Sequence, residues 1–213
     1  MCETVDVLRF RDLFERLFAA LGPQDWWPAR SRFEMMAGAV LTQNTAWRNV
    51  ESSIGRLRGA GLLEASSLAA ADADALRVLI RPSGFMTAKA DSLVRLARWA
   101  LAHDIEVATW DDATLRASLL ALRGVGPETA DSIALYAYDR PLFVWDRYAR
   151  RLLMRVGYEP GASYEAARRA LGPAFRAGGF TLVECQEFHG LLVEAGKRVR
   201  TGWAWFDDLA RQV

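Results

Sequence analysis

Cysteine, histidine and lysine are scarce in this sequence of 213 residues. It contains two cysteines, Cys2 and Cys185, two histidines, His103 and His189, and two lysines. Two thiols and two imidazoles cannot build a disulfide framework or a four-thiolate metal site. We therefore expect no zinc centre, no iron–sulfur cluster and no other cofactor.

Long apolar runs are also lacking, since none approaches the ~20 residues that a membrane-spanning helix needs. The first residues, MCETVDVLRFRDLFERLF, intersperse acids among apolar residues, unlike a signal peptide. The 52% hydrophobic and 25% charged residues are typical of soluble globular proteins, and the length fits one large or two small domains. We expect a cytoplasmic protein, associated with the nucleoid if it is bacterial, that does not bind a membrane.

The formal net charge of +1 gives no sign of a nucleic-acid partner, but the basic residues are unevenly distributed. All except Lys89 and Lys197 are arginines, and the segment 147–155, RYARRLLMR, carries four of them with no acid. Such a run is either a solvated helix face or a strip that contacts phosphates. Taken alone, the run favours the solvated face.

Apolar residues recur at helical spacing along nearly the whole chain, whereas the alternation typical of strands is absent. The first helix stops at Gly22-Pro23, and Ser31 is the expected N-cap of a helix so apolar that it should be central. Further helices are expected at 46–60, 67–80, 87–102, 111–122, 128–138, 145–156, 163–176 and 181–196. The fold class is therefore all-α, with roughly ten short helices.

A glycine-rich turn separates two of these helices in the string LRGVGPETAD, residues 122–131. Gly124 and Gly126 allow unusual backbone angles and the close approach of another backbone, and Pro127 suits a first helical turn. A helix starting near Glu128 would point N–H groups outward and bind an anion such as a phosphate, with a monovalent cation on the carbonyls of Gly124 and Gly126. The alternative is a tight corner between two helices.

Asp146 follows the apolar run PLFVW. A carboxylate beside such a run loses solvation, which raises its pKa unless a helix N-terminus or a cation compensates. Aspartate is also a good helix N-cap, and that interpretation would be favoured for an arbitrary aspartate in this setting. Because the glycine-rich turn lies upstream, we favour a functional carboxylate at Asp146 over a mere N-cap.

Together these two features resemble the helix-hairpin-helix/Gly-Pro-Asp DNA glycosylases, the endonuclease III superfamily. The string L-x-G-V-G-P-E-T-A-D resembles the hairpin, and VWDRYARRLL resembles the segment with the family's invariant acid, which falls on Asp146. The likeness runs from about residue 26 to about residue 200. It implies that Asp146 stabilises the positive charge that develops on the sugar as the N-glycosidic bond breaks.

The resemblance also implies two helical lobes, with the damaged base bound in the cleft between them. One lobe would be formed by residues 30–138, with the helix-hairpin-helix at about 111–138. The other would be formed by both termini, residues 1–29 and 139–213. No linker marks a boundary, so two lobes require the chain to cross between them more than once.

Members of the family that also cut the DNA backbone use a lysine in the second helix of the hairpin, which forms a Schiff base with the sugar. Glu128 stands at the matching position, and a carboxylate cannot form an imine. Lys89 falls in a helix far from the motif in sequence. The resemblance therefore implies a monofunctional glycosylase that leaves an abasic site for a separate endonuclease.

The segments DWWP, LTQNTAW and RPSGF resemble those of the 3-methyladenine DNA glycosylase III branch, which lacks an iron–sulfur cluster. That likeness implies that Trp26 and Trp47 face each other across the flipped base. A cationic alkylated purine is electron-poor and gains additionally from indole faces. The alternative is that these tryptophans form a hydrophobic plug or part of the core.

The remaining candidates are named by the same resemblance. Trp27, Glu128 and Lys197 complete the expected base pocket, in which Glu128 suits a positively charged base. Lys197 could contact a phosphate, pair with Glu128 or Asp146, or lie at the surface, and its pKa would fall if it were buried. Gln43 matches the wedge that fills the gap left in the duplex, although it could simply end a buried helix. The expected DNA contacts are Gln43, Asn44, Gly124, Val125, Gly126, Thr129 and Arg147.

We therefore expect a monomeric enzyme that binds double-stranded DNA, flips alkylated purines such as 3-methyladenine and hydrolyses their N-glycosyl bond. Because an alkylated purine carries a positive charge, it leaves without being protonated, and His189 in EFHGLL is expected to be a core or supporting residue. Three alternatives remain: a glycosylase for oxidised or fragmented pyrimidines, a non-catalytic DNA-binding protein, and a helical protein without a DNA role.

Overall fold

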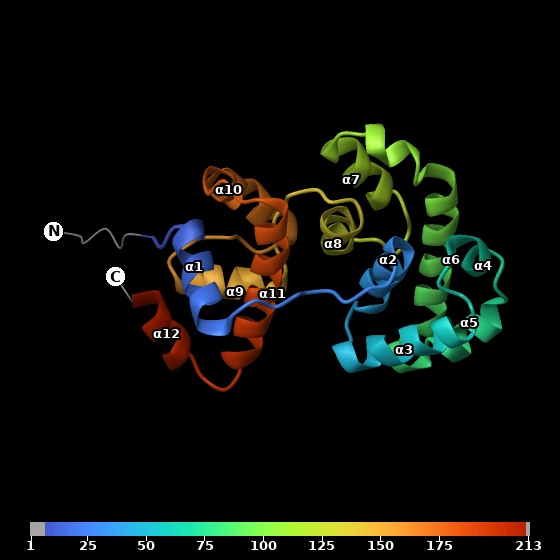
Figure 1. Ribbon diagram of the computed structural model, residues 1–213. Coiled ribbons are helices and arrows are strands. Elements are labelled where there is room, and N and C mark those ends of the chain that lie inside the picture. Colours follow the sequence, from blue (N-terminus) through green and yellow to red (C-terminus); the bar gives the residue numbers. More distant parts are fainter. Residues whose placement is uncertain (1–6, 212–213) are drawn as a thin grey trace. The chain divides into compact units, whose positions relative to one another are not determined.

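The computed structural model describes residues 7–211, and all regular elements in that range are helices (Figure 1). The expectation of an all-α fold is confirmed. None of the helices within residues 7–211 is long and apolar enough to cross a membrane.

The chain folds into two compact units, and it passes from one to the other twice. The central unit is Trp27–Arg140, and the terminal unit combines the described residues up to Trp26 with those from Pro141 onward. The elements of the central unit are α2 (Arg32–Leu41), α3 (Trp47–Gly59), α4 (Ala65–Ala69), α5 (Ala73–Leu79), η1 (Arg81–Ser83), α6 (Met86–His103), η2 (Glu106–Thr109), α7 (Asp112–Leu120) and α8 (Pro127–Ala137). The terminal unit contains α1 (Phe10–Leu21), α9 (Arg147–Arg155), α10 (Tyr164–Ala177), α11 (Leu182–Arg198) and α12 (Ala204–Arg211).

Helix α2 lies in the core of the central unit. The hydroxyl of Ser31 accepts a hydrogen bond from the Glu34 N–H at 3.2 Å, so Ser31 caps the helix as expected. All residues from Phe33 to Leu41 are buried, and α2 packs against α3, α6 and α8. A helix that is apolar all round needs such neighbours on every side.

The expectation of one helix over residues 67–80 is wrong. The chain forms α4 and α5 instead, because Asp72 begins a new helix: its carboxylate accepts the N–H groups of Asp74 and Ala75 at 3.1 and 2.9 Å. A short acidic side chain competes in this way with continuous helix formation.

The core of the terminal unit is built from aromatic rings. The ring of Phe10 on α1 contacts those of Phe143, Trp145 and Phe188, with centroids 5.5, 6.0 and 6.4 Å away. Trp145 is 2% exposed. Because the residue before Asp146 is fixed in this core, the position of the Asp146 backbone is fixed as well.

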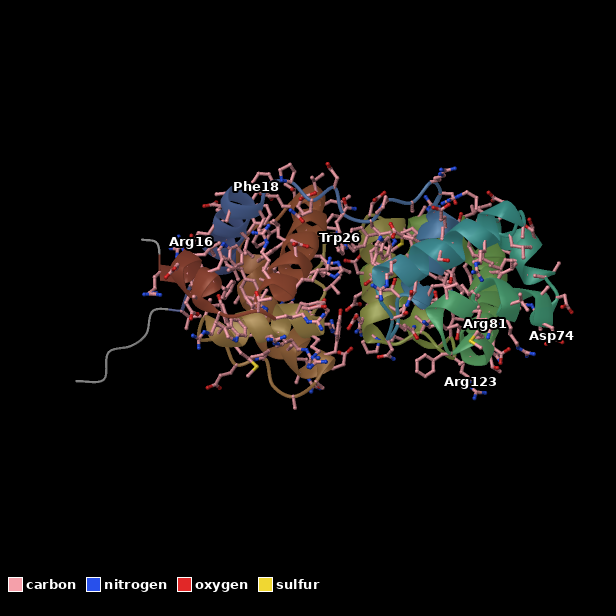
Figure 2. All side chains as sticks on the ribbon, turned by 90° about the horizontal axis from the view of Figure 1, so that it is seen from below. Arg16, Phe18, Trp26, Asp74, Arg81 and Arg123 are labelled. Atoms are coloured by element: carbon pink, nitrogen blue, oxygen red, sulfur yellow. The ribbon has the colours of Figure 1, made fainter. Side chains whose placement is uncertain are left out.

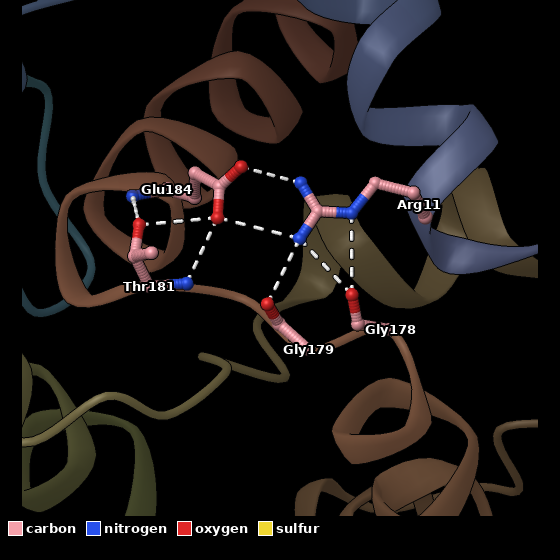
Figure 3. Close-up of polar contacts among 5 residues, drawn as sticks. All are labelled: Arg11, Gly178, Gly179, Thr181 and Glu184. Atoms are coloured by element: carbon pink, nitrogen blue, oxygen red, sulfur yellow. Dashed lines mark hydrogen bonds and ion pairs between the residues drawn. The ribbon is translucent and has the colours of Figure 1, made fainter.

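A polar cluster joins α1 to the start of α11 (Figure 3). Arg11 pairs with Glu184 and donates to the carbonyls of Gly178 and Gly179 at 3.0 and 3.1 Å. Glu184 also completes a capping box with Thr181. The hydrogen bond from Arg11 lowers the pKa of Glu184 to about 2.

Candidate functional site

The glycine-rich turn is held between α7 and α8. Gly124 has φ +95°, and a Cβ there would lie 1.9 Å from the Ser92 hydroxyl, so both conformation and space require glycine. Gly126 has an ordinary φ of −90°, and a Cβ there would meet nothing within 4 Å. The conformational argument from the sequence therefore holds for Gly124 but not for Gly126, which borders open space where a ligand can approach.

The hairpin is anchored by its buried residues. Val125 is 5% exposed, so its side chain belongs to the core. Arg116 on α7 pairs with the buried carboxylate of Asp131 on α8 at 2.7 Å. No side chain caps the start of α8. The first turn of a helix presents N–H groups that lack intrahelical partners, and such a terminus binds phosphates.

Gln43 lies against the hairpin. Its amide nitrogen donates to the Gly124 carbonyl at 2.9 Å and to the Thr129 hydroxyl at 3.0 Å. Asn44 is exposed, with φ +52°. The structure thus brings together Gln43 and the hairpin, two parts of the expected DNA contact.

The hairpin carbonyls already accept hydrogen bonds within the central unit. Gly124 accepts from Gln43, and Gly126 accepts from the Ala130 N–H at 2.9 Å. A carbonyl oxygen has two lone pairs, so each retains acceptor capacity. The monovalent cation expected here stays a prediction.

Two of the predicted tryptophans line a pocket in the central unit. The rings of Trp27 and Trp47 meet edge to face at 5.6 Å, and Trp27 also packs against Tyr136. A Cβ on Gly38, in the middle of α2, would lie 3.3 Å from the Trp27 Nε1, so the glycine makes room for this ring. The pocket has a volume of about 410 Å³ and is lined by Trp27, Pro28, Ala29, Arg30, Glu34, Gly38, Trp47, Val50, Glu51, Ile54 and Arg58.

The wall of this Trp27–Trp47 pocket contains a buried carboxylate that the sequence interpretation missed. Glu34 is 5% exposed, and its Oε1 accepts from Arg58 at 2.6 Å and from the Arg30 N–H at 3.3 Å. The signal was the spacing S-x-x-E from Ser31 to Glu34, which is typical of a capping box.

Asp146 is the N-cap of α9. One carboxylate oxygen, Oδ1, accepts the Ala149 N–H at 2.7 Å, and the other, Oδ2, lies 3.9 Å from the Nε2 of His189. Asp146 and His189 are 6% and 7% exposed. Burial lowers the pKa of His189 to about 4, so its imidazole is neutral at pH 7.

Trp26 packs against α11 in the terminal unit. A Cβ on Gly190 would lie 2.8 Å from the Trp26 Cβ, so only glycine leaves room for this contact. The Trp26 ring meets His189 edge to face at 6.3 Å. The backbone before Trp26 is held by Glu187, whose carboxylate accepts the N–H groups of Gln24 and Asp25 at 2.7 and 2.9 Å.

Lys197 is a surface residue. Its side chain is 45% exposed, its Nζ lies 3.5 Å from a carboxylate oxygen of Glu194, and it stands 5.2 Å from the centre of the Trp26 ring. A contact of Lys197 with a phosphate stays a prediction. Glu128 is exposed on the first turn of α8.

The arginine strip 147–155 is partly used within the chain. Arg151 and Arg155 both stand over the Trp203 ring, and Arg155 pairs with Asp207 on α12 at 2.5 Å. Arg147, the first residue of α9, is exposed. Arg147 is the residue of this strip that the family resemblance names as a DNA contact.

The predicted site residues are divided between the two units. Trp26, Asp146, Arg147 and Lys197 belong to the terminal unit, whereas the Gln43 loop, the hairpin, Glu128 and the Trp27–Trp47 pocket belong to the central unit. The expected meeting of Trp26 with Trp47 across a base therefore stays a prediction. Within residues 7–211, no group of three or more His, Cys, Asp and Glu side chains is placed to hold a metal ion.

Known proteins are similar to this chain in sequence and in fold. Residues 37–176 match the family described as HhH-GPD superfamily base excision DNA repair protein. A candidate DNA repair glycosylase of Methanocaldococcus jannaschii is 40% identical over 192 residues, which cover 87% of this chain and 86% of that protein.

Solved structures agree with this relationship. The Helicobacter pylori 3-methyladenine DNA glycosylase MagIII, bound to 1,N6-ethenoadenine, is 29% identical with a TM-score of 0.74, over 88% of this chain and 98% of that chain. A trapped endonuclease III–DNA covalent intermediate is 19% identical with a TM-score of 0.71, over 88% and 84%, and shows a likeness of fold.

The chain belongs to the HhH-GPD superfamily of base excision DNA repair proteins. Within that superfamily it is a DNA glycosylase, and the resemblance stated from the hairpin and the acid is confirmed.

Proposed function

We propose that this protein is a monofunctional DNA glycosylase that flips alkylated purines, such as 3-methyladenine, out of double-stranded DNA and hydrolyses their N-glycosyl bond. The observation that carries the proposal is the Trp27–Trp47 pocket. Its volume of about 410 Å³ lies within the range of small-molecule sites. Its walls combine two indoles with Glu34 and Glu51 and with two arginines, of which Arg58 pairs with Glu34.

The two indoles of this pocket favour a positively charged base, whereas its two arginines and two glutamates balance in charge. Alkylation of a purine ring nitrogen leaves a formal positive charge, and indole faces attract cations. Unmodified purines are neutral and gain less from the same contacts. The similarity to the Helicobacter pylori enzyme, which was solved with a modified adenine, supports a purine substrate.

Asp146 is the proposed catalytic residue. As the N–glycosyl bond breaks, positive charge develops on the sugar, and a fixed carboxylate in a dry site stabilises that charge most strongly. The Ala149 N–H holds one oxygen of Asp146, so the side chain needs little reorganisation during the reaction. Because a cationic base is a good leaving group, no general acid is required, and the neutral His189 fits a supporting role.

The two lysines support hydrolysis without lyase activity. Lys89 is 3% exposed with its ammonium bonded to two carbonyls, and Lys197 is at the surface beside Glu194. Glu128 occupies the hairpin position at which the lyase members of the family carry their nucleophile. We propose that the product is an abasic site, which a separate endonuclease processes.

The DNA contacts proposed are the hairpin, the Gln43–Asn44 loop and Arg147. The uncapped start of α8 offers N–H groups to a phosphate, and Arg147 adds a positive charge in the first turn of α9. These contacts would position the duplex and carry little sequence preference. We propose that the enzyme acts as a monomer.

Chromatography of the free bases released from methylated duplex DNA tests this function. The wild type should release 3-methyladenine, and Asp146→Asn should release none. Asparagine caps a helix about as well as aspartate, so the variant should fold and still bind abasic-site DNA. Equal release by both proteins would remove Asp146 from the mechanism, and no release by the wild type would contradict the proposed substrate.

A further inference from the structure

Lys89, on the first turns of α6, is buried in the central unit. Its side-chain nitrogen donates to the carbonyls of Leu41 and Ser83, each at 2.8 Å. Burial lowers the pKa of this amine to about 8. Burying a lysine ammonium costs free energy, so its position between two carbonyls must bring a compensating benefit.

The two carbonyls belong to segments far apart in sequence. Leu41 ends α2 and immediately precedes the Gln43 loop, whereas Ser83 ends η1 and precedes the turn at Gly84 and Phe85. The last carbonyls of a helix lack intrahelical partners, so the Leu41 carbonyl needs a donor. Among the side chains, lysine is suited to this task because one flexible stem carries three donors.

Both segments contain a non-glycine residue in the left-handed region. Asn44 has φ +52° and Phe85 has φ +49°, and Phe85 is 68% exposed. Such conformations persist only where the surroundings hold them. Lys89 supplies a fixed point two or three residues before each of them.

The same face of α6 also contacts the hairpin. Ser92 lies one turn after Lys89, and its hydroxyl is 3.4 Å from the Arg123 carbonyl. Gln43 in turn donates to the Gly124 carbonyl. Figure 2 labels Arg81 of η1 and Arg123 of the hairpin, both in the central unit. One turn of α6 therefore joins the Gln43 loop, the Phe85 turn and the hairpin.

We propose that Lys89 is a positioning residue: its ammonium fixes the spacing between the Gln43 loop and the Phe85 turn before DNA binds. Preorganised loops lose less conformational freedom on binding. The inference rests on the proposed function only where it concerns DNA, because the clamp itself is a property of the free protein.

The variant Lys89→Met tests the clamp, because it keeps the apolar stem and removes all donors. Leu93→Ala is the matched control: Leu93 is fully buried on the same helix, and its truncation destabilises α6 without touching either carbonyl. Two quantities are measured well below the unfolding temperatures. One is hydrogen exchange of the amides in residues 42–45 and 83–86, and the other is the ratio of affinities for duplexes with and without a tetrahydrofuran abasic-site analogue.

In Lys89→Met, exchange should accelerate in those two segments more than elsewhere, and the affinity ratio should fall about tenfold, because hydrogen bonds from a charged donor are lost. Leu93→Ala should not accelerate exchange selectively in those two segments, and it should leave the affinity ratio unchanged. Equal effects in both variants, or an unchanged ratio in Lys89→Met, would overturn the proposal. Lys89→Gln, which retains a shorter donor, replaces Lys89→Met if the latter does not fold. A wild type with no preference for the abasic analogue would instead contradict the proposed function, and the exchange data would still decide the clamp.

Discussion

Gly190 determines where the Trp26 side chain can lie. It sits in the middle of α11, where alanine would normally favour the helix by about 1 kcal/mol. The packing opposes that gain, because a Cβ on Gly190 would approach the Cβ of Trp26 to 2.8 Å and that of Gln24 to 3.1 Å. A larger residue at position 190 therefore displaces the Trp26 side chain.

We predict that Gly190→Ala lowers the rate of base release at least tenfold while the protein stays folded, if Trp26 contacts the flipped base as the family resemblance implies. A loss of this size corresponds to about 1.4 kcal/mol. The control is Gly55→Ala in α3, where an added Cβ meets nothing within 4 Å. Base release assayed on methylated duplex DNA decides the matter: normal rates in Gly190→Ala would remove Trp26 from the site.

For Asp146, the sequence alone does not distinguish a helix N-cap from a catalytic acid. The N-cap and the catalytic acid were alternatives in the sequence, because each accounts for an aspartate at that position. In the structure a single carboxylate caps α9 with one oxygen and turns the other toward His189. The contact with His189 could not be predicted, since the two residues stand 43 positions apart in the sequence.

At the scale of elements, the two hairpin glycines should respond differently to substitution. Gly126→Ala should unfold with a free energy within about 1 kcal/mol of the wild type, because its φ and its surroundings accept a side chain and only its N-cap position disfavours alanine. Its affinity for duplex DNA should fall several-fold, because the methyl group occupies the space through which a phosphate reaches α8. Gly124→Ala should lose about 1–3 kcal/mol of stability, from its positive φ and the clash with Ser92.

Urea unfolding and salt-dependent DNA titrations measure both effects. If Gly126→Ala binds DNA as tightly as the wild type, the start of α8 is not a phosphate site and the hairpin is only a corner between helices.

The Arg11–Glu184 cluster predicts an acid-sensitive contribution to stability. The pKa of Glu184 is lowered from 4.5 to about 2 in the folded protein, so its stabilising effect is complete above the unfolded value and disappears as the pH falls through 2. Glu184→Gln should cost about 1–2 kcal/mol at pH 7, allowing for solvent screening, and the difference should shrink toward zero at pH 2.

Urea unfolding at pH 7, 4 and 2 follows this difference, with the exposed Glu159→Gln of the same unit as control. A difference between wild type and Glu184→Gln that stayed constant down to pH 2 would show that packing, and not the charge, carries the effect.

Local signals predicted some elements well and others not at all. Ser31 and the hairpin residues placed α2 and α8 because capping and turn chemistry act within a few residues. The alanine-rich pattern of residues 67–80 predicts one helix, whereas Asp72 begins a new one within it. Helix α12 was not expected, since it depends on distant partners: Asp207 pairs with Arg155, and Trp203 lies beneath Arg151 and Arg155.

At the scale of the whole molecule, the residues proposed for function are divided between two units that the chain enters alternately. Asp146 and Trp26 come from the terminal unit, and the hairpin and the Trp27–Trp47 pocket come from the central unit. Composition could not predict this division, because no linker separates the units in sequence. The expectation of two lobes came instead from the resemblance of LRGVGPETAD and VWDRYARRLL to the family.

The chemistry of the whole enzyme should be hydrolytic. Borohydride added during the reaction should trap no protein–DNA adduct in the wild type, because Glu128 cannot form an imine. Glu128→Lys is the informative control: an amine at this position should yield a trapped band if the position matches the family's nucleophile. A strong band in the wild type would contradict the monofunctional assignment.

The most direct test of the account compares lesions under single-turnover conditions, with the enzyme in excess over duplexes that each contain one damaged base. We predict rapid release of 3-methyladenine, a cationic purine, and release at least a hundredfold slower from a duplex with an oxidised pyrimidine such as dihydrothymine, which is neutral and non-planar. Faster release of the oxidised pyrimidine would contradict the central claim that this protein selects its substrate by positive charge and stacking on indole.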